Sequence, residues 1–353
     1  YKKTTDLLLN MPIPSTAGFT SIMKNAGSVE NRGYEIELTT INLNGPLEWR
    51  TNFNFAANKN RILDLGGRGN ILIGTSSYQA IIKAGGSLGS WYGYMSDGMW
   101  TQDDLTYARS SGGTSTYTVV HGHEHAEVPG EILKYGLRKY KDINNDGVIN
   151  DKDRTIIGNS QPKFFGGITN SFSYRGLSLS FFLEYSYGRQ LFDMTRANFV
   201  DATGGYNHFA VDRYYPAVYA LVQDAGGNWV EDRSQVLEPG NPSGKYPLFS
   251  QGGLGGWTID QFIEDGSYLR MKDLTISYNI PTHGHLLSTL KMSQCQVWIR
   301  GSNLFTITSY PGNDPAVNSD GASNSGGAGL LSGKDWSSYP LYKTYAIGIN
   351  LNF

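Results

Sequence analysis

Apolar and polar residues alternate most regularly between Phe164 and Tyr187. The second half of this stretch places apolar side chains at every other position: Leu177, Leu179, Phe181, Leu183, Tyr185 and Tyr187. The first half does the same with Phe164, Ile168, Phe172 and Tyr174, and only Phe182 is out of step. A period of two indicates strands, because successive side chains leave opposite faces of a pleated chain. Arg175-Gly176 between the halves has the length of a tight turn, so the sequence predicts a β-hairpin.

The length and the aromatic ends of this hairpin favour a membrane strand over a soluble one. Each arm is about ten residues long, as are strands that cross an outer membrane. Such strands turn an apolar face with aromatic girdles toward lipid and a small polar face toward a wet lumen. A soluble sandwich with an inward apolar face shows the same alternation. We predict the membrane arrangement.

The same alternation returns in other parts of the chain. We expect further strands at 34–39, 47–58, 268–280, 297–305 and 345–353. The polar positions of these strands and of the hairpin supply the expected lumen lining: Glu48, Arg50, Asn52, Asn54 and Glu184. Short connections alternate with long, Gly-rich ones at 60–160, 188–267 and 306–341, which we expect to be irregular external loops. Barrels of the outer membrane have short periplasmic turns and long external loops. The predicted fold class is all-β, with about eight to ten antiparallel strands of a large transmembrane β-barrel.

Composition agrees with this fold and excludes several function classes. Charged residues are 17% and aromatic residues 13% of the 353 residues, and the net charge is −2, so no basic field attracts nucleic acid. No apolar run approaches the length of a membrane helix. The single cysteine, Cys295, excludes an internal disulfide framework. The polar start at Tyr1 has no signal peptide, which an exported barrel requires, so we expect a preceding segment unless the membrane interpretation is wrong.

Several short motifs resemble those of SusC/RagA-type TonB-dependent outer-membrane transporters of Bacteroidota. They occur in order along nearly the whole chain: Asn31–Glu35, Trp91–Tyr94 with Asp97-Gly98, Lys139–Gly147, Ile157–Asn159 with Pro162–Phe164, Gly266–Lys272, Asn303–Phe305 and Gly348–Phe353. The resemblance covers the C-terminal portion of the family's barrel. It implies a barrel of about 22 strands around a plug, with the plug and the N-terminal strands absent from residues 1–353.

The resemblance also implies a function, a location and partners. The function would be import of oligosaccharides or peptides across the cell outer membrane. A SusD-like surface lipoprotein would cap the external loops, and TonB would act through the N-terminal half. Further partners would be the rest of the barrel, the plug, outer-membrane lipid and lipopolysaccharide, but no nucleic acid.

Residues 142–153 match a calcium-loop pattern. Oxygen-bearing residues stand at positions 1, 3, 5, 7, 9 and 12 of the pattern: Asp142, Asn144, Asp146, Val148, Asn150 and Asp153. Gly147 holds position six, where a sharp turn requires glycine. Asp153 replaces the usual bidentate Glu, which predicts a weaker site. We expect a structural Ca²⁺ in an external loop. The alternative is a plain Asn/Asp turn, because these residues form turns without a metal.

Two other polar clusters are weaker candidates for chemistry. His121, His123 and His125 could present three imidazoles to zinc or nickel, although a solvated loop is the better interpretation. Asp97 with Asp103 and Asp104 supply the carboxylates that glycoside hydrolysis requires, but nothing places them across a sugar and turn roles are more common. No nucleophile elbow or phosphate loop occurs, so we predict that the protein is not an enzyme.

Aromatic residues of the long loops are candidates for ligand binding, because aromatic rings stack on sugars or anchor peptides. The candidates are Trp91, Tyr92, Trp100, Tyr214, Trp257 and Trp336. The alternative for each is an interfacial position without a ligand.

Two rival functions remain at this point. One is a passive porin or adhesin-like barrel without energy coupling. The other is a secreted calcium-dependent carbohydrate-binding β-sandwich, which predicts solubility without detergent. The residues do not distinguish a glycan cargo from a peptide.

Overall fold

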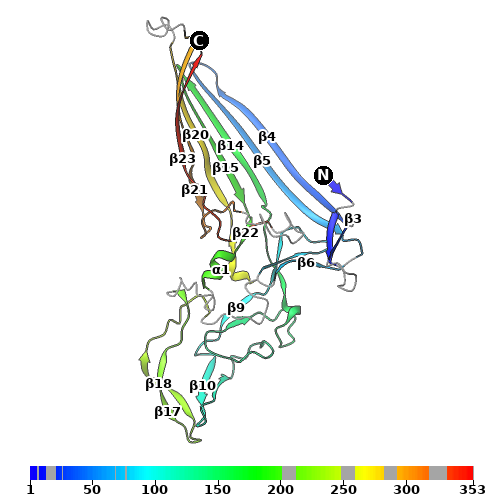
Figure 1. Cartoon of the computed structure of the whole chain (residues 1–353), viewed down its shortest axis with the longest axis vertical. Coiled ribbons are helices and arrows are strands. Elements are labelled where there is room, and N and C mark those ends of the chain that lie inside the picture. The colour runs from blue at the N-terminus through cyan, green and yellow to red at the C-terminus, as the bar shows by residue number, and fades with distance from the viewer. Residues whose placement is uncertain are drawn as a thin grey trace.

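The computed structural model is elongated, with one long sheet at one end and a set of shorter strands at the other (Figure 1). It describes residues 1–5, 8–12, 21–25, 27–67, 69–75, 78–200, 212–247, 259–281, 292–317 and 332–352. Within these ranges, no helix is both long and apolar enough to cross a membrane.

The long sheet contains eight antiparallel strands in the order β1-β4-β5-β14-β15-β20-β21-β23. Their bounds are Lys2–Thr4 (β1), Ser28–Leu43 (β4), Leu47–Asp64 (β5), Phe164–Tyr174 (β14), Leu177–Tyr187 (β15), Tyr268–Ile280 (β20), Gln294–Thr308 (β21) and Thr344–Asn352 (β23). The predicted hairpin is confirmed, and its register runs without a shift from Phe164↔Tyr187 to Tyr174↔Leu177. Arg175 and Gly176 both have positive φ (47° and 85°), as a twist-matched two-residue turn requires.

The two faces of this sheet differ as the alternation predicts. One face carries large apolar side chains that are exposed: Tyr34, Ile36, Leu38, Ile276, Tyr278, Ile299, Ile347 and Ile349. The same face carries stacked rings near both ends, with ring centroids 5.5 Å apart for Trp49–Phe172 and 4.9 Å for Phe164–Tyr187. We call it the outward face. The opposite, inward face is amide- and hydroxyl-rich, with contacts such as the 3.0 Å hydrogen bond that Asn52 donates to Thr39.

Phe182, which breaks the alternation, lies at a β-bulge. The pairing of β15 with β20 shifts between Phe182 and Leu183, which leaves Lys272 as the extra residue. The Phe182 ring lies over Gly167 on the inward face, where a Cβ on the glycine would approach the ring within 2.3 Å. A glycine covered by a neighbouring ring keeps a strand both closely packed and shielded.

The long connections are more ordered than the sequence suggests. Their expected irregularity is wrong, because 60–160 contains the short strands β6 (Ile71–Thr75), β7 (Tyr78–Ile82), β8 (Ser90–Gly93), β9 (Ser96–Met99), β10 (Leu105–Arg109), β11 (Ser115–Val119), β12 (Arg138–Tyr140) and β13 (Thr155–Asn159). None of these joins the long sheet. Strands this short, separated by glycine turns, show too few periods to be recognised from sequence.

The other long connections also form strands. They are β16 (Gln190–Asp193), β17 (Val218–Gln223), β18 (Trp229–Glu238), β19 (Ile263–Asp265) and β22 (Lys334–Asp335), with the helix α1 (Met194–Val200). Near the start of the chain, β2 (Leu8–Pro12) pairs with β3 (Ser21–Asn25).

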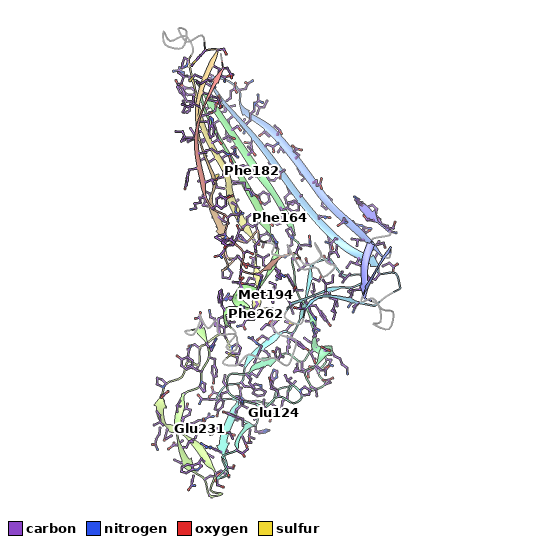
Figure 2. The ribbon with its side chains drawn as sticks, in the orientation of Figure 1. Glu124, Phe164, Phe182, Met194, Glu231 and Phe262 are labelled. Carbon is purple, nitrogen blue, oxygen red and sulfur yellow. The ribbon has the colours of Figure 1, made fainter. Side chains whose placement is uncertain are left out.

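Most of the buried apolar core lies among the shorter strands β6–β13, β16–β19 and β22 with α1, which we call the external region. A smaller cluster includes Val29 of β4 and Ile62 of β5. One cluster packs Trp91, Phe192, Met194 and Phe262 together, and Figure 2 shows Met194 and Phe262 between the sheet and the distal strands. A second cluster surrounds Trp100 and Leu105. The long sheet instead exposes its apolar side chains, so its outward face requires an apolar solvent.

A charge on the outward face is therefore expected to destabilise the protein. Ile276→Lys, in the full-length protein folded into phosphocholine bilayers, should lower the free energy of unfolding by about 2–4 kcal/mol. The matched variant Ser180→Lys places the same charge on the inward face and should cost less than 1 kcal/mol. Denaturant titration in bilayers measures both. Equal losses in the two variants would contradict the assignment of the faces.

Candidate functional site

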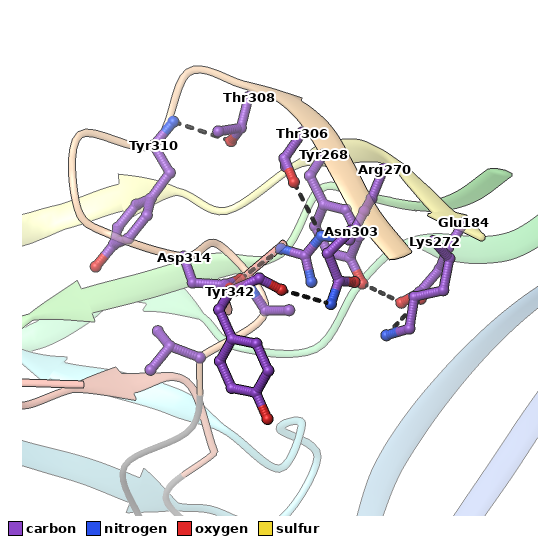
Figure 3. Close-up of polar contacts among 12 residues, drawn as sticks. Glu184, Tyr268, Arg270, Lys272, Asn303, Thr306, Thr308, Tyr310, Asp314 and Tyr342 are labelled. Atoms are coloured by element: carbon purple, nitrogen blue, oxygen red, sulfur yellow. Dashed lines mark hydrogen bonds and ion pairs between the residues drawn. The ribbon is translucent and has the colours of Figure 1, made fainter. Parts of the chain in front are cut away.

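An ionic network covers the inward face where the long sheet meets the external region (Figure 3). The register brings Glu184 of β15, Arg270 of β20 and Thr306 of β21 side by side. Arg270 is buried, forms a 2.6 Å ion pair with Asp314 and donates a 2.9 Å hydrogen bond to Thr306. Asp314 lies in the chain after β21, so this pair holds that segment against the sheet.

A second pair of partners extends the same network. Tyr268 donates a 2.6 Å hydrogen bond to Glu184, and Lys272 lies 3.3 Å from the same carboxylate. Of these residues, sequence reasoning identified only Glu184. The others are joined by strand pairing between distant segments, and the spacing of residues along the chain does not reveal that pairing.

Two buried carboxylates form another anchor at the junction. β16 and β22 pair in parallel, which places Asp193 beside Asp335. Asp335 accepts a 2.7 Å hydrogen bond from Tyr310, and Asp193 accepts one from the backbone N–H of Arg196. Burial, with a smaller contribution from the neighbouring Asp335 charge, raises the pKa of Asp193 to about 6, against the lowering effect of Arg196. This carboxyl group is therefore poised to titrate just below neutral pH.

The calcium-pattern loop is folded around its own carboxylates. Asp142 accepts hydrogen bonds from the backbone amides of Asn145 (2.7 Å) and Gly147 (2.8 Å). Asp153 is completely buried and accepts from the amides of Ile143 and Asn150. Gly147 has a φ of +81°, as the pattern requires at position six.

The chemistry of the donors in this loop fits Ca²⁺, since carboxylate, amide and carbonyl oxygens recur at the required spacing. In the arrangement present, however, the carboxylates hold backbone amides. Within the described ranges, no group of three or more His, Cys, Asp or Glu side chains converges to hold a metal. Calcium binding remains a prediction.

The three histidines face three different carboxylates and do not converge. His121 lies 2.9 Å from Glu124, His123 lies 3.1 Å from Asp104, and His125 lies 2.8 Å from Asp97. The three imidazoles therefore do not gather around one point, and the zinc or nickel alternative has no support from this arrangement.

Hydrogen bonds hold Asp104 as an ion. Burial alone would raise the pKa of Asp104, but hydrogen bonds from Thr101, His123 and Lys139 outweigh it and lower the pKa to about 2. Asp97 pairs with His125, while the Lys139 Nζ lies 3.2 Å from the Asp104 carboxylate. A carboxylate with so low a pKa is a poor proton donor at neutral pH.

Three of the six aromatic candidates are buried. Trp91, Trp100 and Tyr214 are 1–2% exposed and belong to the hydrophobic cores. Tyr92 is half-buried, with the Arg154 guanidinium 4.7 Å from its ring centre, and Trp336 is 40% exposed. Trp257 lies outside the described residues. Ligand contact by any of the six remains a prediction.

The titration of Asp193 predicts a pH-dependent junction. Its folded pKa lies above the unfolded value, so docking of β22 on β16 should strengthen as the pH falls from about 7 toward 4, by roughly 2 kcal/mol in all. Asp193→Asn retains an oxygen that accepts from Arg196 and should remove this dependence. Hydrogen exchange of the β16 and β22 amides at pH 7.5 and 5.5, corrected for intrinsic rates, measures it. An unchanged pH dependence in Asp193→Asn would exclude this carboxyl group as its source.

No family model matches this chain, but individual proteins are similar to it along its whole length. Three relatives are TonB-dependent receptor P26 (28% identical) and P39 (30%) of Formosa agariphila and TonB-dependent receptor SusC of Bacteroides thetaiotaomicron (23%). Each similarity covers 100% of this chain but only 32%, 33% and 29% of the respective relative. The chain thus spans about a third of the length of these relatives.

A solved structure shows the same fold. The structure of the RagAB peptide transporter superposes with a TM-score of 0.64 at 19% identity, over 99% of this chain and 32% of that one. The RagAB peptide importer in its 'open-open' state gives a TM-score of 0.59 at 20% identity. The fold of this chain is therefore that of a portion of a large transmembrane β-barrel with long external loops, and the resemblance to SusC/RagA-type TonB-dependent transporters is confirmed.

Proposed function

We propose that this chain forms part of the wall and the external loops of a TonB-dependent importer in the cell outer membrane. The observation that carries the proposal is the eight-stranded sheet with an exposed apolar face, an opposite polar face and full-length similarity to TonB-dependent receptors. The outward face would contact lipid. The inward face would line the lumen around a plug supplied by the remaining two thirds of the protein.

The external region would serve the capture of cargo. Its own hydrophobic cores make it a stable platform that a SusD-like surface lipoprotein would cap. Oligosaccharides and peptides are the two cargo classes, and the solved structure of similar fold is a peptide transporter. The relatives are named as receptors and the solved structure of similar fold as a transporter, which supports a role without catalysis.

Energy coupling distinguishes this proposal from a passive porin. A strain that lacks the gene for the full-length protein should fail to grow on the cognate oligosaccharide or peptide, and disruption of tonB should reproduce the defect. Deletion of a neighbouring gene for a SusD-like lipoprotein should reduce uptake without removing the barrel from the membrane. Uptake that continues at the wild-type rate in the tonB mutant would favour the passive barrel.

We also propose that residues 142–153 bind Ca²⁺ as a brace for the external region. Support comes from the spacing of oxygen donors, the positive φ of Gly147 and the fully buried Asp153. A bound cation would offset the charges of Asp142, Asp146 and Asp153 and fix the loop beside β13.

Removal of one donor should therefore weaken calcium binding without unfolding the loop. Asp146→Ala, at position five, should reduce Ca²⁺ affinity at least tenfold, because it removes one of three carboxylates. Asp151→Ala is the matched control, since Asp151 has the same side chain at a position that donates nothing in the pattern. Isothermal titration of the full-length protein with CaCl₂ compares the two. If the wild-type protein binds no Ca²⁺ at millimolar concentration, the proposal is wrong and residues 142–153 form a plain Asn/Asp turn.

A further inference from the structure

A groove of about 1090 Å³ opens where β5 leaves β14 at the external end of the long sheet. β14 pairs with β5 only up to Phe165↔Ala56, and Figure 1 shows β4 and β5 diverging from β14 and β15 beyond this point. Backbone hydrogen bonds between Ile62 and the Gly85-Gly86 segment close the far end of the wedge. The groove is therefore a bounded opening in the wall.

The charge of this groove is one-sided. Three cationic side chains line it, namely Arg32, Lys59 and Lys163, and its lining includes no carboxylate. Arg32 contacts Glu30 at 2.6 Å behind the groove, yet its side chain remains 69% exposed. In the described part of the chain, Lys59 and Lys163 have no ion-pair partner, and both are exposed. With Glu30 counted, the groove carries a net charge of about +2 for an anion to neutralise.

The remaining lining is suited to a sugar. It provides amide and hydroxyl groups and two tyrosine rings: Asn58, Asn60, Ser87, Asn159, Gln161, Gln190, Tyr1 and Tyr34. Part of this lining is fixed in advance, because Asn60 accepts hydrogen bonds from Ser87 and the Leu88 amide, and Gln190 accepts one from the Asn159 amide. Preorganised amides and rings favour a saccharide over a bare ion.

The mouth of the groove continues into the apolar band of the outward face. The register pairs Arg32 with Lys59 and Tyr34 with Ala57, which places these four side chains on the outward face. Tyr34, Ile36 and Leu38 follow along β4 on that face and are 78%, 54% and 53% exposed. A ligand with a charged sugar head and acyl chains would meet amides and cations within the groove and apolar surface beyond its mouth.

We propose that this groove binds the phosphorylated disaccharide headgroup of an outer-leaflet glycolipid, with its acyl chains along β4. The proposal goes beyond import and rests on the membrane position proposed above. Its binding assay needs no transport, so the two proposals fail separately. The groove opens to the lipid-facing side at Arg32, Tyr34, Ala57 and Lys59, while Asn58 and Asn60 line its inner side. A bound headgroup would fill the wedge between β5 and β14.

The test uses purified full-length protein, delipidated in detergent, with bisphosphorylated lipid A as the probe and native mass spectrometry as the readout. Removal of both phosphates from the probe should weaken binding at least tenfold. The triple variant Arg32→Gln/Lys59→Gln/Lys163→Gln should also weaken it by well over tenfold, at about fivefold for each cation. Arg50→Gln is the matched control, because it removes a cation of the same strand from the inward face, and its affinity should stay within twofold of wild type.

Three results would overturn the proposal. One is a triple variant that binds lipid A as wild type does, and another is equal binding of phosphorylated and dephosphorylated lipid. The third is equal affinity for a soluble phosphorylated disaccharide without acyl chains, which would make the site one for free anionic sugars. Heat-modifiable migration in electrophoresis verifies that each variant is folded. If the triple variant is not folded, the single variants Lys59→Gln and Lys163→Gln are measured in its place.

Discussion

The register of the long sheet is the constraint on which the rest of this structure depends. Side chains alternate with a period of two, so a slip of β15 by one residue along β14 would turn Phe181 inward and its neighbour Ser180 toward lipid. The continuous pairing from Phe164 to Tyr174 prevents this slip. The one bulge in the neighbouring pair, at Phe182, occurs where a ring is needed over Gly167 and Lys272 is needed beside Glu184.

The long strands could be predicted from sequence because each carries its face pattern within itself. Residues 164–187 need no partner to reveal two faces, and the same holds for 47–58. The external strands could not be predicted from sequence. β8 and β12 span only four and three residues, and their side chains are buried on more than one side. A short strand inside a compact region shows no alternation, so glycine turns were the only visible signal and suggested loops.

The site was less predictable than the fold, for a related reason. Trp91 and Tyr214 lie in Gly-rich segments and seemed exposed, but those segments fold back on themselves and bury them. Arg270 and Asp314 stand 44 residues apart, and only the pairing of β20 with β21 and the return of the following chain bring them together. The calcium-pattern loop was recognisable because its donors are local in sequence, as are the turns that they stabilise.

The long sheet and the external region are stabilised by different means. The sheet depends on its ladder and on an apolar solvent, whereas the external region has its own core. Asp193 and Asp335 lie side by side on β16 and β22, and the chain that leaves Asp335 carries the exposed rings of Trp336, Tyr339 and Tyr342. Because Asp335 is fixed by Tyr310 at its buried end, these rings start from a rigid point. Exposed aromatic residues of this region thus follow directly on a buried carboxylate that is held by a hydrogen bond, so a change at Asp335 would alter the point from which their chain starts.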